Sequence, residues 1–280
     1  MIILIYSYES RGPGKVIKNL KLGLDLLGIE YKENPNSIDA GDHVIALQWS
    51  DLVYSINPNK LTIGPNICTL PKDNTFIMGE NYRNILVPSK WVFDLYSKWI
   101  SPKKIKIWPV GIDTNFFYDM SGEEKTNDFL IYFKNRDPLF LTEINKKLND
   151  MGLSYKNIKY GEYSEQDLLE IGRRSKFCIL LDNTESQGIA ILEIMSMNLP
   201  MIVMDKKTWD DLKETSGTPA TSVPYWSEEC GILIEKLDDL EFAINKIKNT
   251  KYNPRNFILK NLSVEECAKN LLDIIESGDK

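Results

Sequence analysis

Short apolar runs alternate along the chain with longer segments in which apolar residues recur every three or four positions. The short runs predict buried strands, and the periodic segments predict amphipathic helices. In the first part of the chain, strands are predicted at residues 2–6, 42–48, 61–63, 76–78, 84–87 and 104–108. Helices are predicted at residues 16–27, ending at Gly28, and from a cap at Ser89 to about residue 99.

The same alternation continues in the second part of the chain. Strands are predicted at residues 129–133, 158–160, 175–182 and 201–204, and helices at residues 139–151, 165–175, 189–197, 209–215, 237–248 and 264–277. This order predicts an α/β fold in which helices cover both faces of parallel sheets. Residues 119–127 are polar and contain a glycine, which favours a linker, so we expect domains at residues 1–118 and 119–280.

The most informative segment connects the predicted strand at residues 175–182 to the one at residues 201–204. Glu193 is the only charge in the apolar run 189–197, which predicts a buried helix that carries one carboxylate. A carboxylate is rarely fully buried unless something pairs with it. Glu185 lies eight residues earlier, up to roughly 12 Å away along a helix. The two carboxylates could therefore hold a ligand that has hydroxyls at both ends.

The turn between these glutamates suits a phosphate group. Ligands of open parallel sheets bind at the loops that follow the C-terminal ends of strands. Because Gly188 has no side chain, a ligand could approach the backbone closely beside Gln187 and Gly188. The N–H groups of Gly188, Ile189 and Ala190 would open the helix at its positive dipole end. The alternative interpretation is a surface glutamate followed by one that only caps a helix.

Two features of the predicted first domain carry weaker signals. Gly12 and Gly14 belong to a Gly-Pro-Gly turn after the first strand, which predicts either backbone approach to a phosphate or an ordinary tight turn. His43 is the only histidine and precedes an apolar strand. That position favours a partly buried or surface residue over a catalytic base.

Three ordered motifs resemble a known family. The Glu-x7-Glu segment at residues 185–193, its apolar helix and the proline-led strand after it resemble the donor site of retaining GT-B glycosyltransferases of family four, glycosyl transferases group 1. Val-Pro-Ser-Lys-Trp-Val at residues 87–92 and Ile-Trp-Pro-Val-Gly-Ile-Asp-Thr-Asn-Phe-Phe at residues 107–117 occur in the order that this family shows. The last motif is similar to the family's interdomain signature, which makes Asp113 a hinge or turn residue.

The resemblance implies two Rossmann-like domains whose parallel sheets face across a cleft. The N-terminal domain would be a short acceptor domain, and the C-terminal domain would bind the nucleotide-sugar donor. The last helix would be free to pack back on the N-terminal domain.

The resemblance also implies roles for single residues. Glu193 would bind the ribose of the nucleotide, and Glu185 would bind the hydroxyls of the transferred sugar. Lys134 and Arg136 would stabilise the departing diphosphate. The family's two cations are usually spaced more widely, so Lys146 or Lys147 is an alternative for the second one.

Three implied contacts concern the rest of the donor. Tyr160 and Gly161 end a predicted strand where the family binds the nucleotide base, although a simple turn is an equal alternative. Gly188, Ile189 and Ala190 would hold the diphosphate together with the cations. Gly12 and Gly14 would lie beside the diphosphate or the acceptor.

Composition narrows the function classes. The chain has 280 residues and a net charge of −6, so it lacks the basic surface expected of a nucleic-acid binder. No apolar run is long enough for a transmembrane helix, which leaves peripheral membrane contact open. Four cysteines without metal-ligand spacing indicate cytoplasmic thiols that form no disulfides. No Asp-x-Asp pair occurs, which favours cationic side chains over a metal ion at a diphosphate.

The preferred interpretation is a hexosyl- or pentosyltransferase that uses a UDP- or GDP-linked sugar without a further cofactor. It would transfer the sugar to a glycan or another hydroxyl acceptor with retention. Glu185, Lys134 and Arg136 would carry the reaction. Two alternatives remain: an inverting, exostosin-like transferase, and a non-catalytic module that binds sugar nucleotides or glycans.

Overall fold

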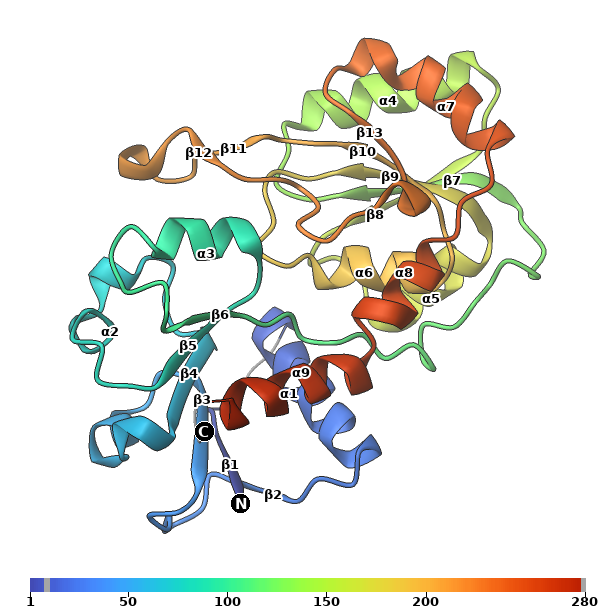
Figure 1. Ribbon diagram of the computed structural model, residues 1–280. Coiled ribbons are helices and arrows are strands. Elements are labelled where there is room, and N and C mark those ends of the chain that lie inside the picture. Colours follow the sequence, from blue (N-terminus) through green and yellow to red (C-terminus); the bar gives the residue numbers. More distant parts are fainter. Residues whose placement is uncertain (8–10, 278–280) are drawn as a thin grey trace. The chain divides into compact units, whose positions relative to one another are not determined.

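The computed structural model describes residues 1–7 and 11–277 and divides them into two compact units (Figure 1). Unit 1 consists of Met1–Gly111 and Leu262–Lys280, and unit 2 of Ile112–Asn261. The sequence predicts one domain boundary, between residues 118 and 119. In the structure the units meet at two boundaries, between residues 111 and 112 and between residues 261 and 262. Within the described residues, no helix is both long and apolar enough to cross a membrane. All four cysteines lie there, and none forms a disulfide.

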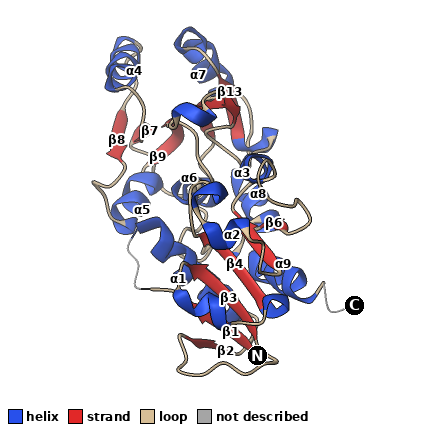
Figure 2. Cartoon of the chain, turned by 90° about the vertical axis from the view of Figure 1, so that its left-hand side faces the viewer, coloured by secondary structure: helices blue, strands red, loops and turns tan. Residues whose placement is uncertain are grey.

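Unit 1 is built on a six-stranded parallel sheet with the order β2-β1-β3-β4-β5-β6. Its strands are β1 (Ile2–Ile5), β2 (Tyr31–Glu33), β3 (His43–Gln48), β4 (Leu61–Asn66), β5 (Asn84–Val87) and β6 (Ile105–Ile107). The helices are α1 (Arg11–Leu26), α2 (Thr75–Met78), α3 (Lys90–Tyr96) and α9 (Val264–Glu276). Strands β1, β3 and β4 run side by side in Figure 2.

The last helix, α9, packs against α1 in unit 1 (Figure 1). The approach is close because Gly23 of α1 has no side chain: a Cβ there would lie 2.4 Å from the carbonyl oxygen of Val264. Trp108, which follows β6, is fully buried and donates a hydrogen bond from Nε1 to the carbonyl oxygen of Cys267 at 2.8 Å. The C-terminal segment is therefore part of the core of unit 1.

Unit 2 contains a five-stranded parallel sheet with the order β13-β10-β9-β7-β8. Its strands are β7 (Asn127–Phe133), β8 (Tyr155–Lys159), β9 (Ser175–Leu181), β10 (Met201–Met204) and β13 (Gly231–Ile234). Helices α4 (Pro138–Asp150) and α7 (Leu240–Asn249) cover one face, and α5 (Glu165–Arg173), α6 (Ile189–Ser196) and α8 (Pro254–Asn261) cover the other (Figure 1). The predicted α/β fold with parallel sheets is confirmed.

A small antiparallel hairpin projects from unit 2, formed by β11 (Thr208–Trp209) and β12 (Thr218–Pro219) (Figure 1). The predicted helix at residues 209–215 is therefore wrong. The carboxylate of Asp210 explains the difference, because it accepts hydrogen bonds from the backbone N–H of Gly217 at 2.9 Å and from the hydroxyl of Thr208 at 2.9 Å. Such local bonds to an aspartate compete with helix formation.

Two further predictions in unit 1 are wrong. Residues 76–78 form part of helix α2 rather than a strand, because Asn74 caps this helix by accepting from the N–H groups of Phe76 and Ile77. Gly12 and Gly14 lie inside α1 rather than in a loop, since proline is tolerated in a first helical turn. Residues 9 and 10 of that predicted loop lie outside the described residues. The sequence prediction also lacks β2, β13 and α8.

Candidate functional site

The C-terminal ends of three neighbouring strands of unit 2 collect the chemically active side chains. Strand β7 lies between β9 and β8. Lys134 and Arg136 follow β7, Glu185 follows β9, and Tyr160 follows β8. The N–H of Lys134 still donates to the carbonyl oxygen of Leu181 at 2.8 Å, so the first residue after β7 stays aligned with the end of β9. Parallel topology thus brings together residues about fifty positions apart.

Lys134 is the central cation of this cluster. Its ammonium makes a close ion pair with Oε1 of Glu185 and lies 4.5 Å from the ring centroid of Tyr160. It is also 4.0 Å from Oδ2 of Asp182. Burial lowers the pKa of Lys134, and the charge of Asp182 opposes that shift. The lysine is therefore a largely buried cation held between two carboxylates and an aromatic face.

Arg136 supplies a second cation at the same strand end. Its Nη1 donates to the carbonyl oxygen of Asp182 at 3.0 Å, and its guanidinium lies 5.4 Å from the ring centroid of Phe140. Burial lowers the pKa of Arg136, but a guanidinium remains charged in proteins. Arg136 therefore places a second positive charge at the C-terminal edge of the sheet.

Helix α6 begins at this edge with an open N-terminus. Gly188 is its N-cap at φ 77° and ψ 51°, a left-handed conformation that favours glycine. The carbonyl of Gly188 accepts from the N–H groups of Ile191 at 2.9 Å and Leu192 at 3.1 Å. The N–H groups of Ile189 and Ala190 precede these and have no partner within the helix. They form a donor pair at the positive end of a helix dipole.

Glu193 lies in the middle of α6 and is only 1% exposed. Gln187, just before the helix, is also buried. The Glu193 carboxylate acts on Tyr163: burial chiefly raises the pKa of Tyr163 to about 12, and the glutamate charge adds to the rise. The Tyr163 hydroxyl donates to that of Tyr132 at 3.2 Å. Glu193 is therefore a buried carboxylate, as the apolar run predicts, and it lies near the half-buried Tyr163 and the buried Tyr132.

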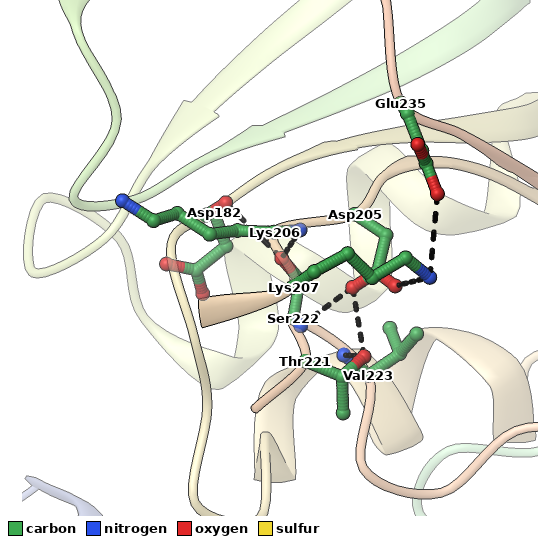
Figure 3. A network of polar contacts seen from close by, with 8 residues as sticks. All are labelled: Asp182, Asp205, Lys206, Lys207, Thr221, Ser222, Val223 and Glu235. Atoms are coloured by element: carbon green, nitrogen blue, oxygen red, sulfur yellow. Dashed lines mark hydrogen bonds and ion pairs between the residues drawn. The ribbon is translucent and has the colours of Figure 1, made fainter. Parts of the chain in front are cut away.

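A second polar network supports the loop that carries Glu185 (Figure 3). Asp205, at the end of β10, is 5% exposed and accepts from the hydroxyl of Thr221 at 2.7 Å and from the N–H of Ser222 at 2.8 Å. The hydroxyl of Ser222 donates to the carbonyl oxygen of Asp182 at 3.3 Å. The N–H of Glu185 donates to the carbonyl oxygen of Thr221 at 3.0 Å. Asp205 thus fixes the segment against which the Glu185 loop rests.

The structure places most of the predicted donor-site residues at one sheet edge. Lys134, Glu185 and Tyr160 are in mutual contact through the lysine, and Arg136 adjoins them through Asp182. Gln187, Gly188, Ile189 and Ala190 continue from Glu185 into α6, and Gly161 follows Tyr160 at φ 83°. Gly12 and Gly14 belong to unit 1.

Sequence analysis did not identify Asp182, Asp205 or Ser222 as parts of this site. The position of Asp182 directly after a buried strand was a signal for it, whereas nothing in the sequence links Asp205 to Ser222. Over the described ranges 1–7 and 11–277, no group of three or more His, Cys, Asp and Glu side chains is placed to hold a metal ion.

Comparisons with known proteins identify the fold. No family model matches the sequence, and no curated protein matches it. Solved structures do match: the lipopolysaccharide outer core galactosyltransferase WaaB in its apo form has a TM-score of 0.61 at 12% identity, with 99% of each chain covered. A sucrose-phosphate synthase from Thermosynechococcus elongatus has a TM-score of 0.56 at 12% identity, covering 99% of this chain and 98% of that one.

WaaG, a glycosyltransferase involved in lipopolysaccharide biosynthesis, has a TM-score of 0.51 at 11% identity, covering 98% of this chain and 99% of its own. At these identities the likeness concerns the fold. The chain therefore has a GT-B fold, as the resemblance of its motifs implies.

Proposed function

We propose that this protein is a glycosyltransferase that moves a sugar from a nucleotide-diphosphate sugar to a hydroxyl of a glycan or another acceptor. One observation carries the proposal: on a GT-B fold, Lys134 pairs with Glu185 and Arg136 bonds to Asp182 at the sheet edge where the chain leaves β9 and enters α6. Structures with the same fold are named as glycosyltransferases and as a sucrose-phosphate synthase. The donor would be UDP- or GDP-linked.

Each group has a role suited to its chemistry. The carboxylate of Glu185 accepts hydrogen bonds from hydroxyls of the transferred sugar, and Glu193 accepts them from the ribose. The burial of Glu193 supports this assignment, because a carboxylate is rarely held inside an apolar helix unless it serves a specific polar contact. Tyr160 and Gly161 contact the nucleotide base.

Departure of the diphosphate is the step that needs stabilisation, because negative charge develops on the leaving oxygen. Lys134, Arg136 and the N–H groups of Ile189 and Ala190 supply preorganised positive charge for it. These groups do the work of a metal ion, so the reaction proceeds without one. The expected result is that a chelator such as EDTA leaves turnover unchanged, and strict dependence on added Mn²⁺ or Mg²⁺ would contradict this role.

The stereochemical proposal is retention, with the acceptor attacking on the face from which the diphosphate departs. That route needs no strong base from the protein. The anomeric proton of the product, observed by NMR during the reaction, reports the outcome. A product of inverted configuration would instead favour an inverting transferase with a carboxylate base.

A nucleotide-release assay tests the proposal, with UDP-glucose, UDP-galactose, GDP-mannose and ADP-glucose as donors. A thermal-shift screen with the same compounds first selects the donor, since a ligand that binds only the native state raises the melting temperature. Continuous release of one free nucleotide is the expected result. Stabilisation by a sugar nucleotide without any release would show a binding module rather than an enzyme.

A further inference from the structure

Asp182 has a buried carboxylate oxygen that the roles above leave unexplained. The residue directly follows β9 and is 0% exposed. Its Oδ1 accepts from the N–H of Asn183 at 2.7 Å, but within the described residues its Oδ2 has no hydrogen-bond partner. A buried acceptor without a partner costs free energy, so its retention calls for a reason.

The backbone of Asp182 is held firmly in this position. Its carbonyl oxygen accepts from Nη1 of Arg136 at 3.0 Å and from the hydroxyl of Ser222 at 3.3 Å. Ser222 is fixed in turn by Asp205, to which its N–H donates (Figure 3). The carboxylate is therefore anchored beside the cluster.

The ammonium of Lys134 pairs with Glu185 and lies 4.0 Å from Oδ2 of Asp182. A sugar hydroxyl that bonds to Oε1 of Glu185 would compete with Lys134 for that oxygen. A charged hydrogen bond forms at about 2.7–2.9 Å, so the ammonium needs to shift by only about 1 Å to reach Asp182. The flexible four-carbon stem of lysine permits such a movement.

We propose that Asp182 is a positioning residue that receives Lys134 when a donor sugar takes the lysine's place on Glu185. The inference rests on the proposed function of the site. In the free protein Glu185 holds the lysine; with donor bound, Asp182 holds it beside the diphosphate. The exchange keeps a buried cation paired in both states, and it occurs only when the ligand carries a sugar.

The proposal has a consequence for pH. Burial chiefly raises the pKa of Asp182 to about 7; Lys134, the N–H of Asn183 and Arg136 lower it, and Asp211 of the hairpin raises it. Glu185 is the other carboxylate that contacts Lys134, and Asp205 holds Ser222, whose hydroxyl bonds to the backbone carbonyl of Asp182 rather than to its carboxylate. Asp182 must be ionised to receive the lysine, so the preference for the sugar nucleotide should fall as pH drops from 8 to 6.

The test uses Asp182→Asn, which keeps an oxygen for the N–H of Asn183 but carries no charge. Asp211→Asn is the matched control, because Asp211 is exposed and its charge also acts on Asp182. Calorimetry at pH 8 measures the affinities for UDP-glucose and UDP, and for GDP-mannose and GDP. We expect Asp182→Asn to weaken binding of the sugar nucleotide by about tenfold and to leave binding of the free nucleotide within about twofold.

Stability separates this role from a purely structural one. The pKa of Asp182 is higher in the folded protein than in the unfolded chain. Ionisation of this carboxyl therefore lowers the stability of the folded protein as pH rises from about 4 to about 7. Asp182→Asn should therefore melt at a higher temperature than wild type at pH 8, even though it binds donor more weakly. The wild-type protein gives a second readout that needs no variant: the ratio of sugar-nucleotide to nucleotide affinity should fall between pH 8 and pH 6.

The results of these experiments distinguish a failure of the role of Asp182 from a failure of the proposed function. Equal weakening for nucleotide and sugar nucleotide, no weakening, or a pH-independent wild-type ratio would overturn the role of Asp182 while leaving the proposed function in place. If wild type binds neither pair and no other sugar nucleotide stabilises it, the proposed function fails, and the role of Asp182 fails with it.

Discussion

Replacement of Asp205 by alanine should lower the free energy of unfolding, because the Asp205 carboxylate accepts several hydrogen bonds. Oδ1 of Asp205 accepts two short bonds, from the Thr221 hydroxyl at 2.7 Å and from the Ser222 N–H at 2.8 Å. Within the part of the chain that the structure describes, Oδ2 accepts from Lys207 at 2.6 Å, and that lysine side chain is 54% exposed. An exposed ion pair contributes about 0–1 kcal/mol, whereas a hydrogen bond to a buried charge contributes about 1.5–3 kcal/mol.

The two substitutions at this position should therefore differ. Asp205→Ala removes both bonds to the buried carboxylate and leaves the buried N–H of Ser222 without this acceptor, so we expect a loss of about 3 kcal/mol in the free energy of unfolding. Asp205→Asn keeps the oxygen that accepts both bonds and loses mainly the lysine pair, so we expect a loss of about 1 kcal/mol.

Urea denaturation of the full chain at pH 7, followed by circular dichroism and by tryptophan fluorescence, measures both losses. Agreement of the two probes is required, because a chain of two units need not unfold in a single transition. If the alanine and asparagine variants lost the same stability, or if alanine cost less than about 0.5 kcal/mol, the assignment of Asp205 as the support of the Glu185 loop would be refuted.

Three further substitutions test separate parts of the account. Gly188→Ala should lower the free energy of unfolding, measured by urea denaturation, by about 2 kcal/mol, because its Cβ would lie 2.9 Å from Cδ1 of Ile191 in an already strained left-handed conformation. Gly217→Ala has a similar φ of 79° but open space around it, so it should cost about 1 kcal/mol. Equal costs would contradict the close contact at Gly188. Lys134→Met should lower kcat/KM for nucleotide release by about a hundredfold, and exposed Lys146→Met should stay within twofold; the reverse order would make Lys146 the cation of the site. Trp108→Phe should cost about 2–3 kcal/mol, seen as a fall in melting temperature, because it loses a buried hydrogen bond to α9; an unchanged melting temperature would contradict that packing.

Hydrophobic pattern and turn chemistry predict most of the fold. The run at residues 175–182 contains β9 and the residue after it, and the apolar run around Glu193 is a buried helix. In both segments the spacing of the apolar residues and the length of the run indicate the same element, so local preference and tertiary packing favour the same structure. The helix over residues 209–215 is predicted wrongly because Asp210 forms side-chain bonds across the hairpin.

The sequence indicates which residues of the candidate site lie at strand ends, but not which of them contact each other. The positions of Lys134 and Glu185 at strand ends follow from the strand pattern, because parallel strands end at one edge. Their direct pairing depends on β7 and β9 being neighbours, which the order of elements in the sequence does not state. The bond from Ser222 to Asp182 spans forty residues and depends on how the hairpin returns, so no local signal could predict it.

In the proposed function, the buried carboxylate of Glu193 binds the pentose of a nucleotide-sugar donor. Release of nucleotide from the donor chosen by thermal shift tests this most directly, with wild type compared with Glu193→Ala and with Glu241→Ala, an exposed control on α7. We expect Glu193→Ala to lower kcat/KM by about a hundredfold and the control to match wild type. Turnover near the wild-type rate by a well-folded Glu193→Ala variant would contradict the claim.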